Sequence, residues 1–251
     1  MKLTSEQIEQ YQRQGYILLP DLLRSDEVGQ LQAALPGIFA RSGPEIIREQ
    51  DDVSAVRLAF GAHIYSPPFR ELATSKRLVH PVRQLLQDDV YLHQSRINPK
   101  QGFGSGASWA WHQDYPPWHK IDGMPEPNCV MASVFLDDCT PATSPLLVVP
   151  GSQQVGLLDS RLHKDAKGRG YELHHIDEQV LAELAELHGI DALVGDAGTV
   201  ALVHCNLVHG SANNVSPWRR AIMYLIYNAV GNACTSDRRP WFQNNRDFTP
   251  L

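Results

Sequence analysis

The sequence predicts a mainly β fold, a sandwich or barrel wrapped by helices, in one domain over residues 1–251. Apolar residues recur at the helical spacing through most of residues 1–89 and at the alternating spacing of strands from residue 90 onward. Several short strands that follow a helical layer, separated by Gly, Pro, Asn and Asp, are typical of a sandwich or barrel. No internal repeat or low-complexity linker divides the chain.

The helical layer begins directly after the amino terminus. Thr4 and Gln7 have the spacing of a capping box, and Leu3 with Ile8 can form the hydrophobic staple beside it. The short apolar run at residues 15–20 then predicts a strand.

Two further helices are expected before residue 90. One begins at Ser25, and the other follows Pro67 and Pro68. Their apolar stripes comprise Val28, Leu31 and Leu35 in the first, and Phe69, Leu72, Val79, Val82 and Leu86 in the second.

The later part of the chain is rich in short strands. Strands are expected at residues 90–98, 129–136, 145–149, 199–205 and 220–228. The first of them places Gln94, Arg96 and Asn98 on one face, because alternate strand residues point the same way. One helix interrupts the series: Asp177 caps it, Gly189 ends it, and its stripe comprises Val180, Leu181, Leu184 and Leu187.

Composition excludes several classes of protein. The chain is 43% hydrophobic and 20% charged, which excludes intrinsic disorder. Its net charge of −6 without a basic cluster argues against a nucleic-acid partner, and no apolar run is long enough to cross a membrane. The polar amino terminus and four cysteines without a CxxC pair favour a cytoplasmic protein with reduced thiols. We therefore expect a small-molecule substrate and a monomer or homodimer.

A metal site is predicted around His112 and Asp114. On an extended strand these two side chains would point the same way and could reach one ion. One imidazole and one carboxylate are two thirds of the 2-His-1-carboxylate triad that holds Fe(II) and leaves positions open. His-x-Asp also occurs by chance, so the pattern needs a second histidine from another strand.

His204 and His209 are the candidates for that second histidine. His209 precedes Ser211 and, further on, the adjacent pair Arg219 and Arg220. An arginine with a nearby hydroxyl suits the far carboxylate of a dicarboxylate co-substrate. Only one of two adjacent arginines on a strand can face inward. His204 is better explained as a half-buried strand residue.

These features resemble the phytanoyl-CoA dioxygenase-like superfamily of Fe(II)/2-oxoglutarate oxygenases. The resemblance extends over nearly the whole chain and is strongest to bacterial ectoine hydroxylases and free L-proline 4-hydroxylases. It is carried by residues 90–98, 111–115, 118, 122–124, 145–152, 209–211, 239–240 and 246–251. It implies a double-stranded β-helix core, of the jelly-roll or cupin-like type, with residues 1–89 as a mainly helical layer packed on it.

The resemblance also implies roles for individual residues. The matching positions are His112, Asp114 and His209 as iron ligands; Asn98, Ser211 and Arg220 as contacts to 2-oxoglutarate; and Gln94, Trp118 and Arg239 as contacts to the primary substrate. The chain departs from the family pattern where a co-substrate serine is replaced by Met131, and Ser133 is the residue that could stand in for it.

The implied function is hydroxylation of a small free amino acid or cyclic imino acid, proline-like or ectoine-like. Fe(II), 2-oxoglutarate and O2 would be required, and succinate and CO2 would be released. Two alternatives stay open: the same oxygenase chemistry on another natural-product intermediate, and a metal-binding barrel without turnover. A halogenase is disfavoured because Asp114 fills the position that a halide ligand would need.

Overall fold

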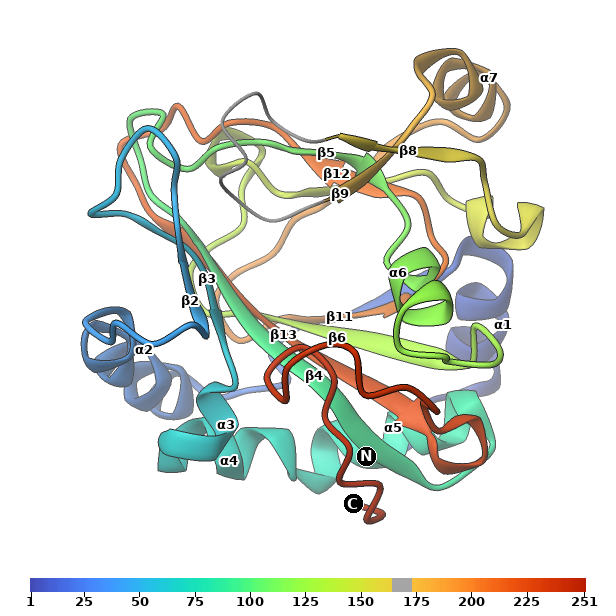
Figure 1. Cartoon of the computed structure of the whole chain (residues 1–251), viewed down its shortest axis with the longest axis horizontal. Coiled ribbons are helices and arrows are strands. Elements are labelled where there is room, and N and C mark those ends of the chain that lie inside the picture. Colours follow the sequence, from blue (N-terminus) through green and yellow to red (C-terminus); the bar gives the residue numbers. More distant parts are fainter. Residues whose placement is uncertain (164–172) are drawn as a thin grey trace.

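Two antiparallel sheets face each other in this computed structural model, which describes residues 1–163 and 173–251. The larger sheet runs through the middle of the molecule, and the smaller one lies opposite it (Figure 1). This arrangement confirms the predicted mainly β fold with a jelly-roll core.

The larger sheet has seven strands and the smaller one four. The larger sheet has the order β1 (Tyr16–Leu19), β11 (Val200–His204), β6 (Cys129–Phe135), β13 (Arg220–Ala229), β4 (Val90–Lys100), β3 (Val56–Phe60) and β2 (Ile46–Arg48). The smaller sheet has the order β10 (Asp191–Leu193), β7 (Leu146–Val148), β12 (His209–Ser211) and β5 (Trp109–His112), and a separate pair comprises β8 (Ser160–His163) and β9 (Leu173–Ile176).

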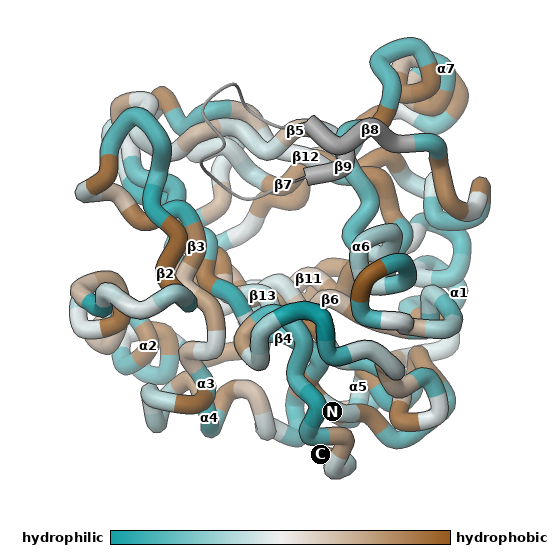
Figure 2. Tube along the Cα trace, in the orientation of Figure 1, coloured by the Kyte–Doolittle hydropathy of each residue, from teal (hydrophilic) through white to brown (hydrophobic). Residues whose placement is uncertain are grey.

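Helices cover the outer face of the larger sheet. The helices are α1 (Ser5–Gln14), α2 (Ser25–Phe39), α3 (Ala62–Tyr65), α4 (Pro67–Ala73), α5 (Lys76–Leu86), α6 (Tyr115–Lys120) and α7 (Glu178–His188), with 3₁₀ turns at Pro141–Thr143, Ser152–Val155 and Val230–Asn232. Helices α2 to α5 lie beneath the larger sheet in Figure 1, whereas α7 lies beside the smaller one. Figure 2 shows hydrophobic and hydrophilic segments alternating along α2 and α7, as expected for helices with one face on the protein.

Local sequence signals account for several element boundaries. The Thr4 hydroxyl accepts a hydrogen bond from the Gln7 backbone, and the Gln7 side chain accepts one from the Thr4 backbone, so the predicted capping box is present. Gly15 ends α1 at a φ of 81°, a left-handed conformation that favours glycine. The Asp177 side chain caps α7, and Gly189 follows its last residue.

The predicted single helix after Pro67 is wrong, because the structure has two helices there. Thr74 ends α4, and its hydroxyl donates to the Arg70 carbonyl. Ser75 then begins α5, since its hydroxyl accepts a hydrogen bond from the Arg77 backbone. The apolar stripe continues across the break, which explains why periodicity alone suggested one helix.

Two other details of the sequence reading are corrected. Strands β2 and β3 lie within the segment that was expected to be helical, and β3 pairs with β4 at one side of the larger sheet. Leu187, assigned to the buried stripe of α7, is 76% exposed, whereas Leu184 is buried. Helix α7 therefore packs through a narrower face than its periodicity suggested.

The inward face of the larger sheet carries the polar residues that matter for function. Strand β13 lies between β4 and β6, and Tyr224 of β13 is opposite Arg96 of β4 and Ser133 of β6. Because strand residues alternate, Gln94, Arg96, Asn98 and Lys100 share one face of β4. Within the described ranges, no helix is long and apolar enough to cross a membrane.

Candidate metal centre and its cavity

His112 and His209 lie side by side on the smaller sheet. Strands β5 and β12 pair so that the two residues are directly opposite, with ring centroids 4.2 Å apart. Nδ1 of His112 lies 2.6 Å from the Ala110 carbonyl, and Nδ1 of His209 lies 2.9 Å from the Leu207 carbonyl. Since a carbonyl only accepts hydrogen bonds, each Nδ1 carries the hydrogen and each Nε2 offers a lone pair to a metal ion.

Asp114 joins the two imidazoles from a different backbone position than the sequence suggested. Strand β5 ends at His112, so Asp114 does not lie on the strand. It is the residue directly before α6, and its backbone has helical dihedral angles. Its Oδ1 lies 3.7 Å from Nε2 of His112, and its Oδ2 lies 3.8 Å from Nε2 of His209. The prediction that His112 and Asp114 share a strand is therefore wrong, although the chain turn after β5 still brings them together.

The charges of these three residues suit a divalent cation. Burial lowers the pKa of His112 to about 3, with a further contribution from His209, and burial also lowers the pKa of His209. Burial by itself would raise the pKa of Asp114, but the Arg96 guanidinium and the two imidazoles outweigh it and lower the pKa to about 2. At neutral pH the site therefore contains two neutral imidazoles and one ionised carboxylate.

His112, Asp114 and His209 fit the 2-His-1-carboxylate pattern of non-haem Fe(II) sites. Their ligand atoms all lie within 4.8 Å of one another, and all three residues are buried. His204 is not part of this group: it is half-buried, and its Nδ1 accepts a hydrogen bond from the Asn206 backbone. A triad of this type leaves coordination positions for other ligands.

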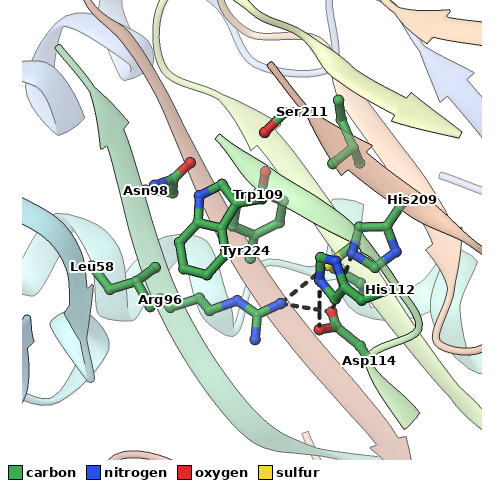
Figure 3. A pocket seen from close by; sticks show the side chains of 11 residues that line it. Leu58, Arg96, Asn98, Trp109, His112, Asp114, His209, Ser211 and Tyr224 are labelled. Carbon is green, nitrogen blue, oxygen red and sulfur yellow. Dashed lines mark hydrogen bonds and ion pairs between the residues drawn. The ribbon is translucent and has the colours of Figure 1, made fainter. Parts of the chain in front are cut away.

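A cavity between the two sheets leads away from the three residues. It is lined by Leu58, Arg96, Asn98, Trp109, His112, Asp114, Met131, Leu146, His209, Ser211 and Tyr224. Figure 3 shows the triad at one end, Asn98 and Ser211 at the other, and the rings of Trp109 and Tyr224 between them. Asn98 and Ser211, expected near a co-substrate, thus share one cavity with the triad.

Arg96 is a site residue to which the sequence reading assigned no role. Its Nη2 donates to Oδ2 of Asp114 at 2.6 Å, and its Nη1 donates to Oε1 of Gln94 at 2.9 Å. The strand periodicity had placed it on the face of Gln94 and Asn98, and this was the signal that could have found it.

Two buried basic side chains, Arg220 and Lys100, lie near Asn98. The Arg220 side chain is fully buried, donates twice to the Ser144 carbonyl at 3.0 and 2.7 Å, and donates to Oδ1 of Asn98 at 3.2 Å. Lys100, which the sequence reading missed, is opposite Arg220 in the sheet and contacts the Ser144 hydroxyl at 3.3 Å. Neither side chain forms an ion pair with a carboxylate among the described residues. Burial, with the charge of Arg220, lowers the pKa of Lys100 to about 6.

Arg219 points elsewhere, as expected for the neighbour of an inward-facing strand residue. Its guanidinium makes two hydrogen bonds to the Asp137 carboxylate, at 2.7 and 2.8 Å. Arg220, and not Arg219, is therefore the arginine near the cavity.

A hydroxyl without a partner lies on the same inward face. The Ser133 Oγ is fully buried and makes no hydrogen bond in the structure. Ser133 is two residues from Met131 on β6, and Met131 lines the cavity. A buried polar atom that lacks a partner is costly unless a ligand or water satisfies it. Ser133 is not itself among the residues that line the cavity.

The residues expected to bind the primary substrate do not line this cavity. Gln94 donates from its side chain to the Gln243 carbonyl at 2.7 Å. Trp118 is fully buried and packs edge-on against His93, with ring centroids 5.3 Å apart. Arg239 makes two hydrogen bonds to the buried carboxylate of Asp122, one from Nε at 2.7 Å.

Comparisons with known proteins identify relatives over most of the chain. The family model described as Phytanoyl-CoA dioxygenase (PhyH) matches residues 11–222. An ectoine dioxygenase from Sphingopyxis alaskensis is 39% identical over 97% of this chain and 83% of its own length. An L-proline trans-4-hydroxylase from Streptomyces griseoviridis is 35% identical over 96% of this chain and 92% of its own length.

A solved structure shares both the fold and much of the sequence. It is EctD from S. alaskensis with 2-oxoglutarate and 5-hydroxyectoine, with a TM-score of 0.85 at 39% identity, over 97% of this chain and 84% of that one. The match covers both sheets and the helical layer. The chain therefore belongs to the phytanoyl-CoA dioxygenase (PhyH) family.

Proposed function

We propose that the protein hydroxylates a small free amino acid or cyclic imino acid, of which ectoine and proline are the models. The chain is an Fe(II)- and 2-oxoglutarate-dependent dioxygenase, which converts 2-oxoglutarate to succinate and CO2 as the substrate gains oxygen. Its similarity to an ectoine dioxygenase and an L-proline 4-hydroxylase over most of the chain supports the substrate class. The observation that carries the proposal is the buried triad in a cavity whose lining includes Asn98, the hydrogen-bond partner of the buried Arg220.

His112, Asp114 and His209 are proposed to hold Fe(II). Their Nδ1–H groups, bonded to backbone carbonyls, fix both imidazoles with Nε2 toward the ion. With 2-oxoglutarate and O2, bound iron supplies the oxidant that replaces a C–H hydrogen by hydroxyl. The surrounding chain excludes water and sets where that C–H lies.

Arg220 and Lys100 are proposed to bind the far carboxylate of 2-oxoglutarate. Arg220 is a buried cation whose present partners are uncharged oxygens, so a carboxylate would supply the missing counter-charge. Lys100 lies beside it, and a bound carboxylate would favour the protonated form of its amine. Asn98 and Ser211 line the cavity on the way from the triad and offer hydrogen bonds along the co-substrate. The Ser133 hydroxyl, which has no hydrogen-bond partner, is a further candidate contact for a polar group of the co-substrate.

Gln94, Trp118 and Arg239 are proposed to bind the primary substrate. An amide, an aromatic wall and a guanidinium suit a compact zwitterion, because arginine pairs with its carboxylate and tryptophan covers its ring. Arg239 is paired with Asp122 in the structure, so the substrate carboxylate would join or replace that partner. No basic patch suited to the phosphates of a coenzyme A thioester is evident in the sequence.

A product screen tests the proposal. The purified protein is incubated aerobically with Fe(II), 2-oxoglutarate and either ectoine, L-proline or another free amino acid, and mass spectrometry detects a product one oxygen atom heavier. We expect one ring-containing substrate to be hydroxylated with release of an equal amount of succinate. Activity only on coenzyme A thioesters or carrier-bound residues would refute the substrate assignment.

The proposal also includes the localisation and the oligomeric state of the protein. We expect a cytoplasmic enzyme that acts as a monomer or homodimer, without a nucleic-acid partner. Its four free cysteines are compatible with a reducing compartment. Cell fractionation and light scattering of the purified protein would test these expectations.

A further inference from the structure

Arg96 connects the metal ligand Asp114, which lies beside it in Figure 3, with the proposed substrate residue Gln94. Its Nη2 donates to Oδ2 of Asp114 at 2.6 Å, and its Nη1 donates to Oε1 of Gln94 at 2.9 Å. Gln94 is held in turn by the hydrogen bond from its amide to the Gln243 carbonyl. The Arg96 and Asp114 side chains are only 9% and 8% exposed, so water competes little for this contact.

Both oxygens of Asp114 face the site. Oδ1 lies 3.7 Å from Nε2 of His112, and Oδ2 lies 3.8 Å from Nε2 of His209. With both oxygens on this side, the carboxylate could bind one ion through two atoms. The protein would then supply four donors rather than three, and one of the positions needed by the co-substrate and the oxidant would be lost.

We propose that Arg96 is a positioning residue that keeps Asp114 a one-oxygen ligand. Oδ2 is held by the guanidinium, which leaves Oδ1 for the metal ion. A hydrogen bond between two charged groups, made by a rigid guanidinium that Gln94 also holds, suits this task. The inference rests on the proposed function, because it requires a metal ion at His112, Asp114 and His209.

A purely structural role for Arg96 predicts the opposite effect on metal affinity. If Arg96 only supported the Asp114 carboxylate, its removal would misplace a ligand and weaken metal binding. If Arg96 restrains Oδ2, its removal adds a ligand atom and removes a positive charge near the cation, so metal binding tightens. Because loss of the charge alone can also tighten binding, the number of water molecules left on the bound ion separates the two roles, together with the affinity and without any measurement of catalysis.

The experiment uses Mn(II), without 2-oxoglutarate, on the wild type and Arg96→Met. Water-proton relaxation reports the exchangeable waters on bound Mn(II), and calorimetry reports its affinity. A three-donor site leaves three of six octahedral positions to water, so a two-oxygen Asp114 should lower the relaxivity of bound Mn(II) by about a third. We expect this decrease together with at least about threefold tighter binding.

Arg219→Met is the matched control, because it removes an arginine that is also doubly bonded to an aspartate, but outside the cavity. It should change neither quantity. Should Arg96→Met fail to fold, Arg96→Leu removes the same charge and the same hydrogen-bond donor, and the same result is expected from it. Unchanged relaxivity or weaker Mn(II) binding in the folded variant would overturn the inference. Failure of the proposed metal site gives a different outcome, in which the wild type binds no Mn(II) or His209→Ala binds it equally well.

Discussion

Replacing Arg220 with glutamine should severely weaken 2-oxoglutarate binding. The Arg220 side chain is fully buried, and its partners are the Ser144 carbonyl and Oδ1 of Asn98, both uncharged. Leaving a buried charge without its partner costs about 2–5 kcal/mol, and here the stranded charge would be the co-substrate carboxylate. Because Lys100 stays beside it, we expect the lower end, about 2 kcal/mol, which is about a thirtyfold rise in the dissociation constant.

The assay for Arg220→Gln is calorimetric titration of the Mn(II)-loaded protein with 2-oxoglutarate, followed by the KM for 2-oxoglutarate in succinate release. Arg219→Gln is the control, since Arg219 pairs with Asp137 away from the cavity. Its affinity for 2-oxoglutarate should stay within about twofold of the wild type. A loss in Arg219→Gln with near-normal binding by Arg220→Gln would refute the reasoning and shift the assignment by one residue.

Three further predictions concern the metal, the pH and the primary substrate. His209→Ala should abolish Fe(II) binding in an iron titration while His204→Ala retains most of it, and the reverse pattern would overturn the ligand assignment. Burial, with the charge of Arg220, lowers the pKa of Lys100 to about 6, whereas a bound carboxylate would raise it. Binding should therefore take up a proton above about pH 6, and affinity for 2-oxoglutarate should fall by up to about tenfold per pH unit as the pH rises. Calorimetry in two buffers of different ionisation enthalpy measures this proton uptake. The Lys100→Met variant should bind 2-oxoglutarate without proton uptake. Binding without proton uptake in the wild type would contradict the prediction. Arg239→Ala should raise the KM for the primary substrate at least about tenfold while leaving 2-oxoglutarate consumption without substrate intact; equal loss of both activities would show that Arg239 acts through the fold.

Local spacing in the sequence determined much of the architecture. The capping box at Thr4, the Asp177 cap and the alternating strands all appear where the pattern placed them, because each depends on residues close together in the chain. Strand alternation also predicted that only one of Arg219 and Arg220 faces inward, and the family resemblance selected Arg220. The structure buries Arg220 and pairs Arg219 with Asp137.

Other features depended on contacts that spacing does not encode. Arg96 and Lys100 lie on a strand whose eleven residues are all buried. Strand spacing places both on the face of Gln94 and Asn98, but it does not tell which residues of other segments they meet. Their roles became visible only when pairing with β13 placed Lys100 opposite Arg220, and the turn after β5 placed Asp114 against Arg96.

The sequence by itself therefore determined the fold class, the family resemblance and the identity of the three metal-binding candidates. Only the tertiary structure decided that Asp114 precedes a helix instead of lying on a strand, and that Arg239 pairs with Asp122, 117 residues away. The physical reason is that backbone periodicity fixes which way a side chain points. Which residue it meets depends on sheet pairing and packing between segments far apart in the chain.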